Sequence, residues 1–390
     1  MKKPKMLYAS PLQPMRSGIS DYSEVLITAL SKQFELTLLT DDYELNSGYL
    51  KNNFPVLKYG KHQVDFENFD YLVYNIGNNP EYHDFIYEVC LEHPGMVILH
   101  DVVLYYLFVG YYQKRNRLYA KVYEQEGTEA FLTLKRAVKR KGADLLAQKE
   151  MAPLLPFHKE LFRSGNRIMV HSWYAYEQVL HTGIVKEKNI AKINPLPYGY
   201  SATLSKAELF EKYRIPQDAY IIASMGYIER TKLNHIACQA VRRLNEEGAR
   251  KVCYVMVGEG FYADGYVDGK VIIKTGYTSL DEFDAFIRYS DIILNLRNPS
   301  MGETSGAMLR ILEQGKVCMI NDGGWFCEIP DRCVKKVCLE NVEEDLYEKI
   351  RMLMEDPQEG KKIGECAAEY MRQEYQEEKI VGKIRKFLER

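Results

Sequence analysis

The sequence lacks several features that would point to common classes of protein. Its 390 residues contain no run of about 18 apolar residues, so no segment is predicted to be a transmembrane helix. The formal net charge of -2 argues against a general nucleic-acid binder. The basic N-terminus, MKKPKMLYASP, is not followed by the apolar stretch of a secretory signal. Together these absences predict a cytoplasmic protein.

Motifs for metals, redox chemistry and dinucleotides are absent as well. The eight cysteines form no C-x-x-C pair, and the cluster of Cys327, Cys333 and Cys338 lacks zinc-site spacing and nearby histidines. We therefore expect free thiols. No D-x-D motif follows a predicted strand, and the first glycine-bearing loop is not G-x-G-x-x-G. We expect neither a metal ion nor a cofactor.

What the sequence does contain is a repeated alternation of buried strands and amphipathic helices. Apolar content of 46% and charged content of 27% are typical of a globular protein, and the length predicts two domains. Short apolar runs end in polar or glycine-bearing loops that precede helical patterns. These runs lie at 6–9, 34–40, 71–76, 96–99, 167–171, 220–225, 252–258, 271–274, 292–296 and 317–320. The pattern predicts two Rossmann-like α/β domains with parallel sheets.

The stretch 291–331 contains several residues that could bind a ligand. A buried strand at 292–296 is followed by a loop, then by Glu303, Thr304 and Ser305 ahead of a helical pattern. The amides of Thr304, Ser305 and Gly306 would point out of a helix N-terminus, which is a natural seat for phosphate. Glu303 could accept hydrogen bonds from hydroxyls attached to that phosphate.

This stretch also resembles a known family. The sequence GETSG at 302–306, with Leu309-Arg310, Gly315-Lys316 and Gly324-Trp325-Phe326, is similar to the donor-binding segment of family 4 glycosyltransferases. PLQPMRSGISDYS at 11–23, YNIGNN at 74–79 and PGMVILHD at 94–101 match as well. The resemblance implies a GT-B fold, in which two Rossmann-like domains face across a cleft. It also implies metal-independent transfer of a hexose from a nucleoside-diphosphate sugar to a glycan or lipid-linked acceptor, with retention, in polysaccharide or glycoconjugate biosynthesis.

The resemblance assigns roles to individual residues. The catalytic candidates are Glu303, His100 and Lys232, of which Lys232 would hold phosphate and His100 could instead be a core histidine. The donor-binding candidates are Ser17, Gly18, Arg230, Gly276, Tyr277, Thr304, Ser305 and Gly306. The acceptor-side candidates are Arg16, Asp21 and Tyr22.

Two positions depart from the family pattern. Tyr227 stands where the family usually has an arginine, for which Arg230 is a substitute candidate. Ile311 stands where many members have a second glutamate that holds the ribose. These departures keep two alternatives open, a non-catalytic nucleotide-sugar-binding protein and a GT-B nucleotide-sugar epimerase. Hydrolysis or transfer of a donor would distinguish an enzyme from a binding protein.

The expected domain boundaries follow from the pattern and the resemblance. We expect an N-terminal acceptor-side domain at 1–200, a C-terminal nucleotide-sugar domain at 201–365, and a final helix at 366–390 that packs back on the first domain. A helical insertion at about 111–163 carries twelve Lys or Arg residues against six Asp or Glu. It would either bind an anionic or lipid-linked acceptor or the inner face of a membrane, or be a solvated helical hairpin.

Overall fold

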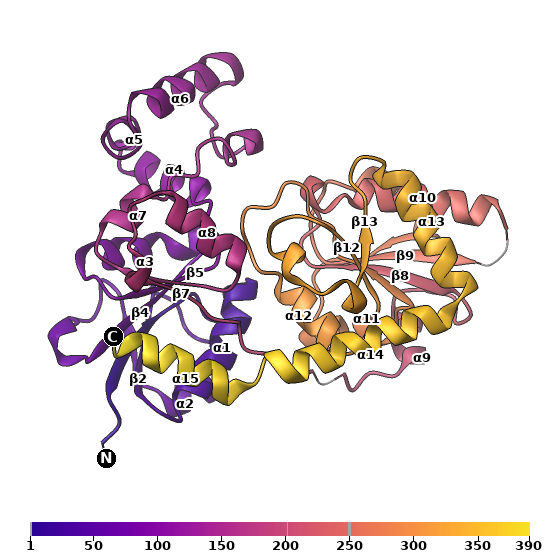
Figure 1. Cartoon of the computed structure of the whole chain (residues 1–390), viewed down its shortest axis with the longest axis horizontal. Coiled ribbons are helices and arrows are strands. Elements are labelled where there is room, and N and C mark those ends of the chain that lie inside the picture. Colours follow the sequence, from indigo (N-terminus) through magenta and orange to yellow (C-terminus); the bar gives the residue numbers. More distant parts are fainter. Residues whose placement is uncertain (1, 201, 249–250) are drawn as a thin grey trace. The chain divides into compact units, whose positions relative to one another are not determined.

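The computed structural model describes residues 2–200, 202–248 and 251–390, and the chain folds into two compact α/β units (Figure 1). Unit 1 comprises Met1–Leu196, Met301–Thr304 and Glu377–Arg390. Unit 2 comprises Pro197–Ser300 and Ser305–Gln376. The prediction of two parallel α/β domains is confirmed.

Unit 1 is built on a parallel sheet of seven strands among the described residues, in the order β3-β2-β1-β4-β5-β6-β7. The strands are β1 (Lys5–Ala9), β2 (Glu35–Thr40), β3 (Val56–Lys58), β4 (Tyr71–Ile76), β5 (Met96–Leu99), β6 (Arg167–Val170) and β7 (Ile190–Lys192). The strand order reverses at β1, which pairs with β2 on one side and β4 on the other. In open parallel sheets, the carboxyl ends of strands beside such a reversal are where ligands bind.

Helices cover the sheet of unit 1, and side-chain caps determine where several of them begin. Ser17 caps α1 by accepting from the Ser20 amide, and Ser172 caps α8 by accepting from the Ala175 amide. The helices that frame the sheet are α1 (Gly18–Leu30), α2 (Gly48–Asn53), α3 (Pro80–Glu92), α8 (Trp173–His181) and α15 (Glu377–Leu388). Arg167 fastens the last of these by donating to the backbone oxygens of Phe387 and Leu388.

The predicted insertion is helical and leaves the sheet between β5 and β6. It consists of α4 (Tyr105–Lys114), α5 (Leu118–Glu126), α6 (Thr128–Lys141) and α7 (Lys159–Arg163). In Figure 1, α5 and α6 project from the sheet of unit 1, whereas α4 and α7 lie closer to it. The insertion is therefore a base of two helices that carries an outer hairpin.

Unit 2 repeats the architecture with a parallel sheet of six strands among the described residues, ordered β10-β9-β8-β11-β12-β13. The strands are β8 (Tyr220–Met225), β9 (Val252–Val257), β10 (Ile272–Lys274), β11 (Ile292–Leu294), β12 (Cys318–Asn321) and β13 (Lys335–Val337). Each residue of β8 and β9 is buried, because helices cover both faces. The helices are α9 (Lys206–Lys212), α10 (Asn234–Glu246), α11 (Leu280–Tyr289), α12 (Gly306–Glu313), α13 (Val342–Glu355) and α14 (Pro357–Glu374).

The unit boundaries differ from the expected domain boundaries. The chain passes from unit 1 to unit 2 at Leu196 and Pro197 rather than at 200. Position 365 lies inside α14, which continues to Glu374, and the chain returns to unit 1 at Glu377. The expected single helix near the C-terminus is thus two helices, of which α15 belongs to unit 1.

Candidate donor-binding site

The N-terminus of α12 begins where the sequence predicted and is held by side chains of unit 2. Ser305 caps the helix by accepting a hydrogen bond of 3.2 Å from the Met308 amide. Asn295, which follows β11, donates to the same Ser305 hydroxyl at 3.1 Å. The helix start is therefore tied to the carboxyl end of a central strand, with the first-turn amides directed outward from the helix.

Gly306, a predicted donor-binding residue, packs closely against Tyr198. A Cβ atom placed on Gly306 would lie 2.6 Å from the hydroxyl of Tyr198 and 3.2 Å from its ring. The space that this glycine leaves on its Cβ side is therefore occupied by Tyr198. The Tyr198 ring in turn stacks on Arg310, whose guanidinium carbon lies 4.4 Å from the ring centroid. Packing against Tyr198 therefore favours glycine at this position.

Lys232 lies at the carboxyl end of β8, the strand next to β11. Its ammonium donates to the Met225 oxygen at 2.9 Å and lies beside Gly226. The Asn298 amide donates to the Thr231 oxygen at 2.8 Å, which joins the loop of Lys232 to the loop after β11. Two predicted phosphate-binding elements, the Lys232 loop and the start of α12, therefore lie at the same edge of one sheet.

The other donor-side residues predicted in unit 2 lie on its surface. Arg230 is exposed in a short 3-10 turn that ends at Lys232. Gly276 follows the edge strand β10 with a φ of +74°, and the side chain of the next residue, Tyr277, is exposed. Ile311, at the position where relatives have a second glutamate, is buried in the core.

Glu303 and Thr304 belong to unit 1 by their packing. The Glu303 carboxylate folds back on its own loop, where Oε2 accepts from the Met301 amide at 2.7 Å. Gly302 has a φ of +84° and packs closely on Val102, so this loop conformation favours glycine. A carboxylate anchored to its own backbone has a defined orientation, which suits a residue that positions hydroxyl groups.

The first loop of unit 1 holds the remaining predicted residues. The Ser17 hydroxyl serves as the cap of α1, and Gly18, the first residue of that helix, is exposed. Arg16 is exposed, and Asp21 accepts from the Gln13 amide nitrogen at 2.8 Å. Tyr22, expected on the acceptor side, is buried, with its ring edge-on to His100 and His171, and its role stays a prediction.

His100 lies at the carboxyl end of β5, as predicted, and is partly accessible. Its Nε2 lies 3.0 Å from Oδ1 of Asn75, so this nitrogen carries the proton, because an amide oxygen only accepts. Burial in low dielectric, together with the neighbouring His171, lowers the pKa of His100 well below its usual range. The side chain is therefore a neutral imidazole at physiological pH.

His171 was not among the residues predicted from the sequence. It follows β6, and its Nδ1 lies 2.9 Å from the Ile193 oxygen. Burial lowers its pKa to about 4. Its Nε2 is buried and has no hydrogen-bond partner among the described residues. The ring centroids of His100 and His171 lie 5.4 Å apart. Unit 1 therefore has two neutral imidazoles at the ends of adjacent strands.

No group of three or more His, Cys, Asp or Glu side chains within the described residues is arranged to hold a metal ion. No helix of that part of the chain is long and apolar enough to cross a membrane. Metal independence stays a prediction.

Two parallel α/β units with this strand order, a helical insertion in the first and a final helix returning to the first define a GT-B fold. Solved structures that are similar to the chain over nearly its whole length include HepE, sucrose-phosphate synthase and WaaG. HepE from Anabaena, in complex with UDP and glucose, has a TM-score of 0.64 at 12% identity and covers 99% of each chain. Sucrose-phosphate synthase from Thermosynechococcus elongatus has a TM-score of 0.66 at 13% identity, covering 99% of this chain and 98% of its own.

The third structure is WaaG, a glycosyltransferase involved in lipopolysaccharide biosynthesis, with a TM-score of 0.61 at 12% identity, covering 97% of this chain and 98% of its own. No protein-family model and no curated protein sequence matches the chain. At these identities the likeness concerns the fold.

Proposed function

We propose that this protein is a retaining glycosyltransferase that moves a hexose from a nucleoside-diphosphate sugar to a glycan or lipid-linked acceptor, in polysaccharide or glycoconjugate biosynthesis. The proposal rests mainly on the arrangement of two predicted phosphate-binding elements at one edge of the unit 2 sheet. There the α12 N-terminus and the Lys232 loop are joined through Asn295 and Asn298 to the loop after β11. The fold likeness supports it, since HepE is solved with UDP-glucose and WaaG is a glycosyltransferase.

Sugar transfer from a nucleoside-diphosphate sugar requires mainly that the leaving diphosphate be stabilised. In the proposed reaction, the bond from the sugar C1 to the phosphate oxygen breaks, and a bond from C1 to the acceptor oxygen forms on the same face. The acceptor proton passes to the departing phosphate oxygen. Lys232 supplies a positive charge, and the α12 amides supply preformed dipoles; removal of one such donor typically costs ~3 kcal/mol in the barrier. This scheme needs no metal ion.

The sugar itself would be held by Glu303 and His100. The anchored Glu303 carboxylate accepts hydrogen bonds from hydroxyls, and the neutral His100 offers Nδ1 as a further acceptor, since Nε2 is engaged by Asn75. A neutral acceptor such as His100 suits an uncharged hydroxyl group, because no buried charge has to be compensated. We place the reaction in the cytoplasm, with the inner face of the membrane as the location of a lipid-linked acceptor.

A panel of nucleoside-diphosphate sugars, screened by thermal shift, tests binding. The donor, present at 100 times its Kd, should stabilise the protein by ~2.7 kcal/mol, whereas sugars without nucleotide should not. The responding donor is then incubated with the protein and release of the nucleoside diphosphate is measured. Binding without any release would indicate a non-catalytic nucleotide-sugar-binding protein, and no binding across the panel would contradict the proposal.

A further inference from the structure

The outer hairpin of the insertion carries a face on which aromatic, apolar and basic side chains are mixed. We define the hairpin face by seven of the exposed residues on α5 and α6, which are Tyr119, Tyr123, Leu132, Lys135, Arg136, Lys139 and Arg140. On each helix these residues recur at spacings of three and four, so they share one side. Tyr123 is 59% exposed and Leu132 is 42% exposed, which is high for side chains of this kind.

The residues of the two helices form one continuous surface. The Phe131 ring lies edge-on to Tyr119 and Tyr123, with centroids 6.2 and 5.9 Å apart. The Lys135 ammonium lies 5.4 Å from the Tyr119 ring and 5.0 Å from the Phe131 ring. Basic heads and tyrosine rings are therefore interleaved, and the pattern extends across both helices.

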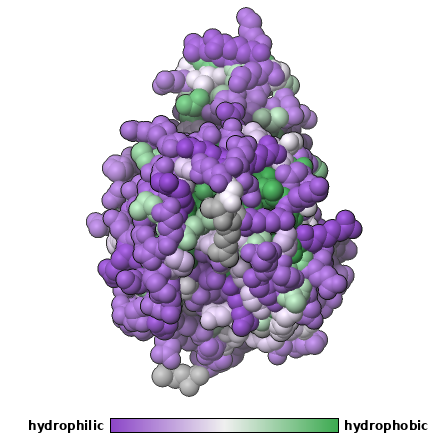
Figure 2. Space-filling view, turned by 90° about the vertical axis from the view of Figure 1, so that its right-hand side faces the viewer, coloured by the Kyte–Doolittle hydropathy of each residue, from purple (hydrophilic) through white to green (hydrophobic). Residues whose placement is uncertain are grey.

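Basic residues outnumber acidic ones on this face, where Glu129 is an exposed carboxylate on the same side of α6. Arg136, Lys139 and Arg140 form no ion pair within the described residues, whereas Lys141 pairs with Glu150 and is not part of the face. Such a concentration of positive charge is out of keeping with a chain of net charge -2. In the space-filling view of Figure 2 the insertion stands at the top, where hydrophilic residues dominate and hydrophobic ones show between them.

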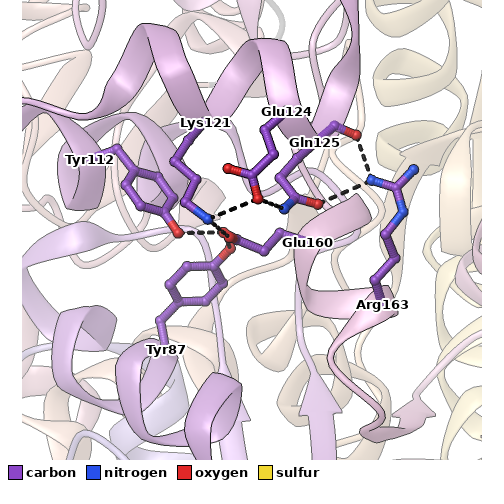
Figure 3. Close-up of polar contacts among 7 residues, drawn as sticks. All are labelled: Tyr87, Tyr112, Lys121, Glu124, Gln125, Glu160 and Arg163. Carbon is purple, nitrogen blue, oxygen red and sulfur yellow. Dashed lines mark hydrogen bonds and ion pairs between the residues drawn. The ribbon is translucent and has the colours of Figure 1, made fainter.

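The hairpin is fixed to unit 1 by a buried carboxylate, so its face has a defined orientation (Figure 3). Oε2 of Glu160, on α7, accepts from the hydroxyl of Tyr87 at 2.9 Å and from that of Tyr112 at 2.6 Å. Lys121, on α5, donates to Oε1 at 3.1 Å. Arg163 adds a bond of 2.6 Å to the backbone of Gln125. These hydrogen bonds hold α5 against α3, α4 and α7.

We propose that the hairpin face docks on the surface of an anionic lipid bilayer. Tyrosine is favoured at the level of the lipid headgroups, basic side chains are attracted to anionic lipids, and Leu132 would enter the boundary of the acyl chains. The face lies on a projecting hairpin rather than in a groove, which fits an extended planar partner (Figure 1). The inference stands on this surface alone and is independent of the proposed sugar transfer.

Co-sedimentation with vesicles tests the inference, using equal parts phosphatidylglycerol and phosphatidylcholine against phosphatidylcholine alone. The intact protein should pellet with the anionic vesicles at low salt, and the bound fraction should fall as salt is raised. The combined substitution Arg136→Gln, Lys139→Gln and Arg140→Gln should weaken binding roughly 100-fold, at about 1 kcal/mol for each cation. Tyr119→Ser with Tyr123→Ser should weaken it at unchanged salt dependence.

A matched control neutralises three exposed lysines of α15, with Lys379→Gln, Lys383→Gln and Lys386→Gln. This variant has the same net charge as the hairpin variant and should pellet like the wild type. Thermal melting and nucleotide-sugar binding should be unchanged in both, because all the substituted side chains are exposed. Equal pelleting with neutral vesicles, no pelleting at all, or an equal loss in the α15 variant would overturn the inference.

Discussion

Gly306 is a position at which packing alone favours glycine. Its missing side chain admits the hydroxyl of Tyr198, and the Tyr198 ring covers Arg310. Arg310 is buried, and it donates to the Gly199 oxygen at 3.2 Å and to both carboxylate oxygens of Asp284 at 3.4 Å. The start of α12 is thus packed against residues 198–199 of the same unit.

Gly306→Ala should destabilise the protein, because its Cβ would lie 2.6 Å from the Tyr198 hydroxyl. We expect a loss of about 1–3 kcal/mol in the free energy of unfolding, the usual cost of overpacking. Adding Tyr198→Phe should recover part of the lost stability, because it removes the clashing oxygen. Chemical denaturation measures both effects. Gly18→Ala is the control, since nothing lies within 4 Å of its added Cβ; equal stability of the two alanine variants would contradict the account.

The sequence could predict those site residues that lie in contiguous motifs. GETSG at 302–306 identified the cap of α12, and the loop after β8 identified Lys232. Tyr198 and His171 could not be predicted in the same way. Each meets its neighbours only through folding across distant segments, and neither lies in a motif. A histidine at the end of a predicted strand was a usable signal for His171, because His100 directly follows the predicted strand at 96–99.

At the scale of elements, the insertion depends on the charge of Glu160. Two tyrosine hydroxyls and Lys121 converge on this nearly buried carboxylate, which comes from a different helix than each of them. The arrangement raises the pKa of Tyr87 and Tyr112, mainly through burial and also through the Glu160 charge. The Glu160 carboxylate therefore supplies the acceptor oxygens that Tyr87, Tyr112 and Lys121 need for their hydrogen bonds.

Glu160→Gln should lower the free energy of unfolding by about 2–3 kcal/mol, because an amide cannot satisfy all three donors and leaves buried groups unpaired. The comparison is Glu124→Gln, which also contacts Lys121 but has a side chain 55% exposed. That change should cost at most about 0.5 kcal/mol. Urea denaturation of the two variants decides the matter, and similar costs would show that the Glu160 cluster does not anchor the hairpin.

The long buried strands were predictable because continuous apolar runs bounded by loops have few other interpretations. The strands β3, β7 and β13, each of three residues at a sheet edge, were not predicted. The break between α14 and α15 was also missed. Residues 375–376 include no glycine or proline, so the sequence predicts that the helix continues across them.

At the scale of the whole molecule, the alternation of strands and helices was enough to predict two parallel α/β units. Buried histidines should make their stability depend on pH. Burial lowers the pKa of His83 and His171 to about 4, against about 6.5 in the unfolded chain. The unfolded chain takes up these protons first. The stability they contribute is therefore complete above about pH 6.5 and is lost as the pH falls towards 4, by roughly 3 kcal/mol for each histidine.

Replacing one of the two histidines tests this dependence. His171→Asn removes one titrating group, so the wild type should lose its stability advantage over the variant as the pH falls from 7 to 4. Denaturation curves measured at several pH values give that difference directly. A difference that stays constant over this range would show that His171 is not kept neutral by the fold.

The central claim is that this chain transfers sugar from a nucleoside-diphosphate sugar without a metal ion. The most direct test measures release of nucleoside diphosphate from the donor found by thermal shift, in excess EDTA, for the wild type and Glu303→Gln. We predict that release continues in EDTA and falls at least about 100-fold in the variant, which should keep its fold because Glu303 lies in a loop. Release that vanishes in EDTA and returns with magnesium or manganese, or a variant as active as the wild type, would contradict the account.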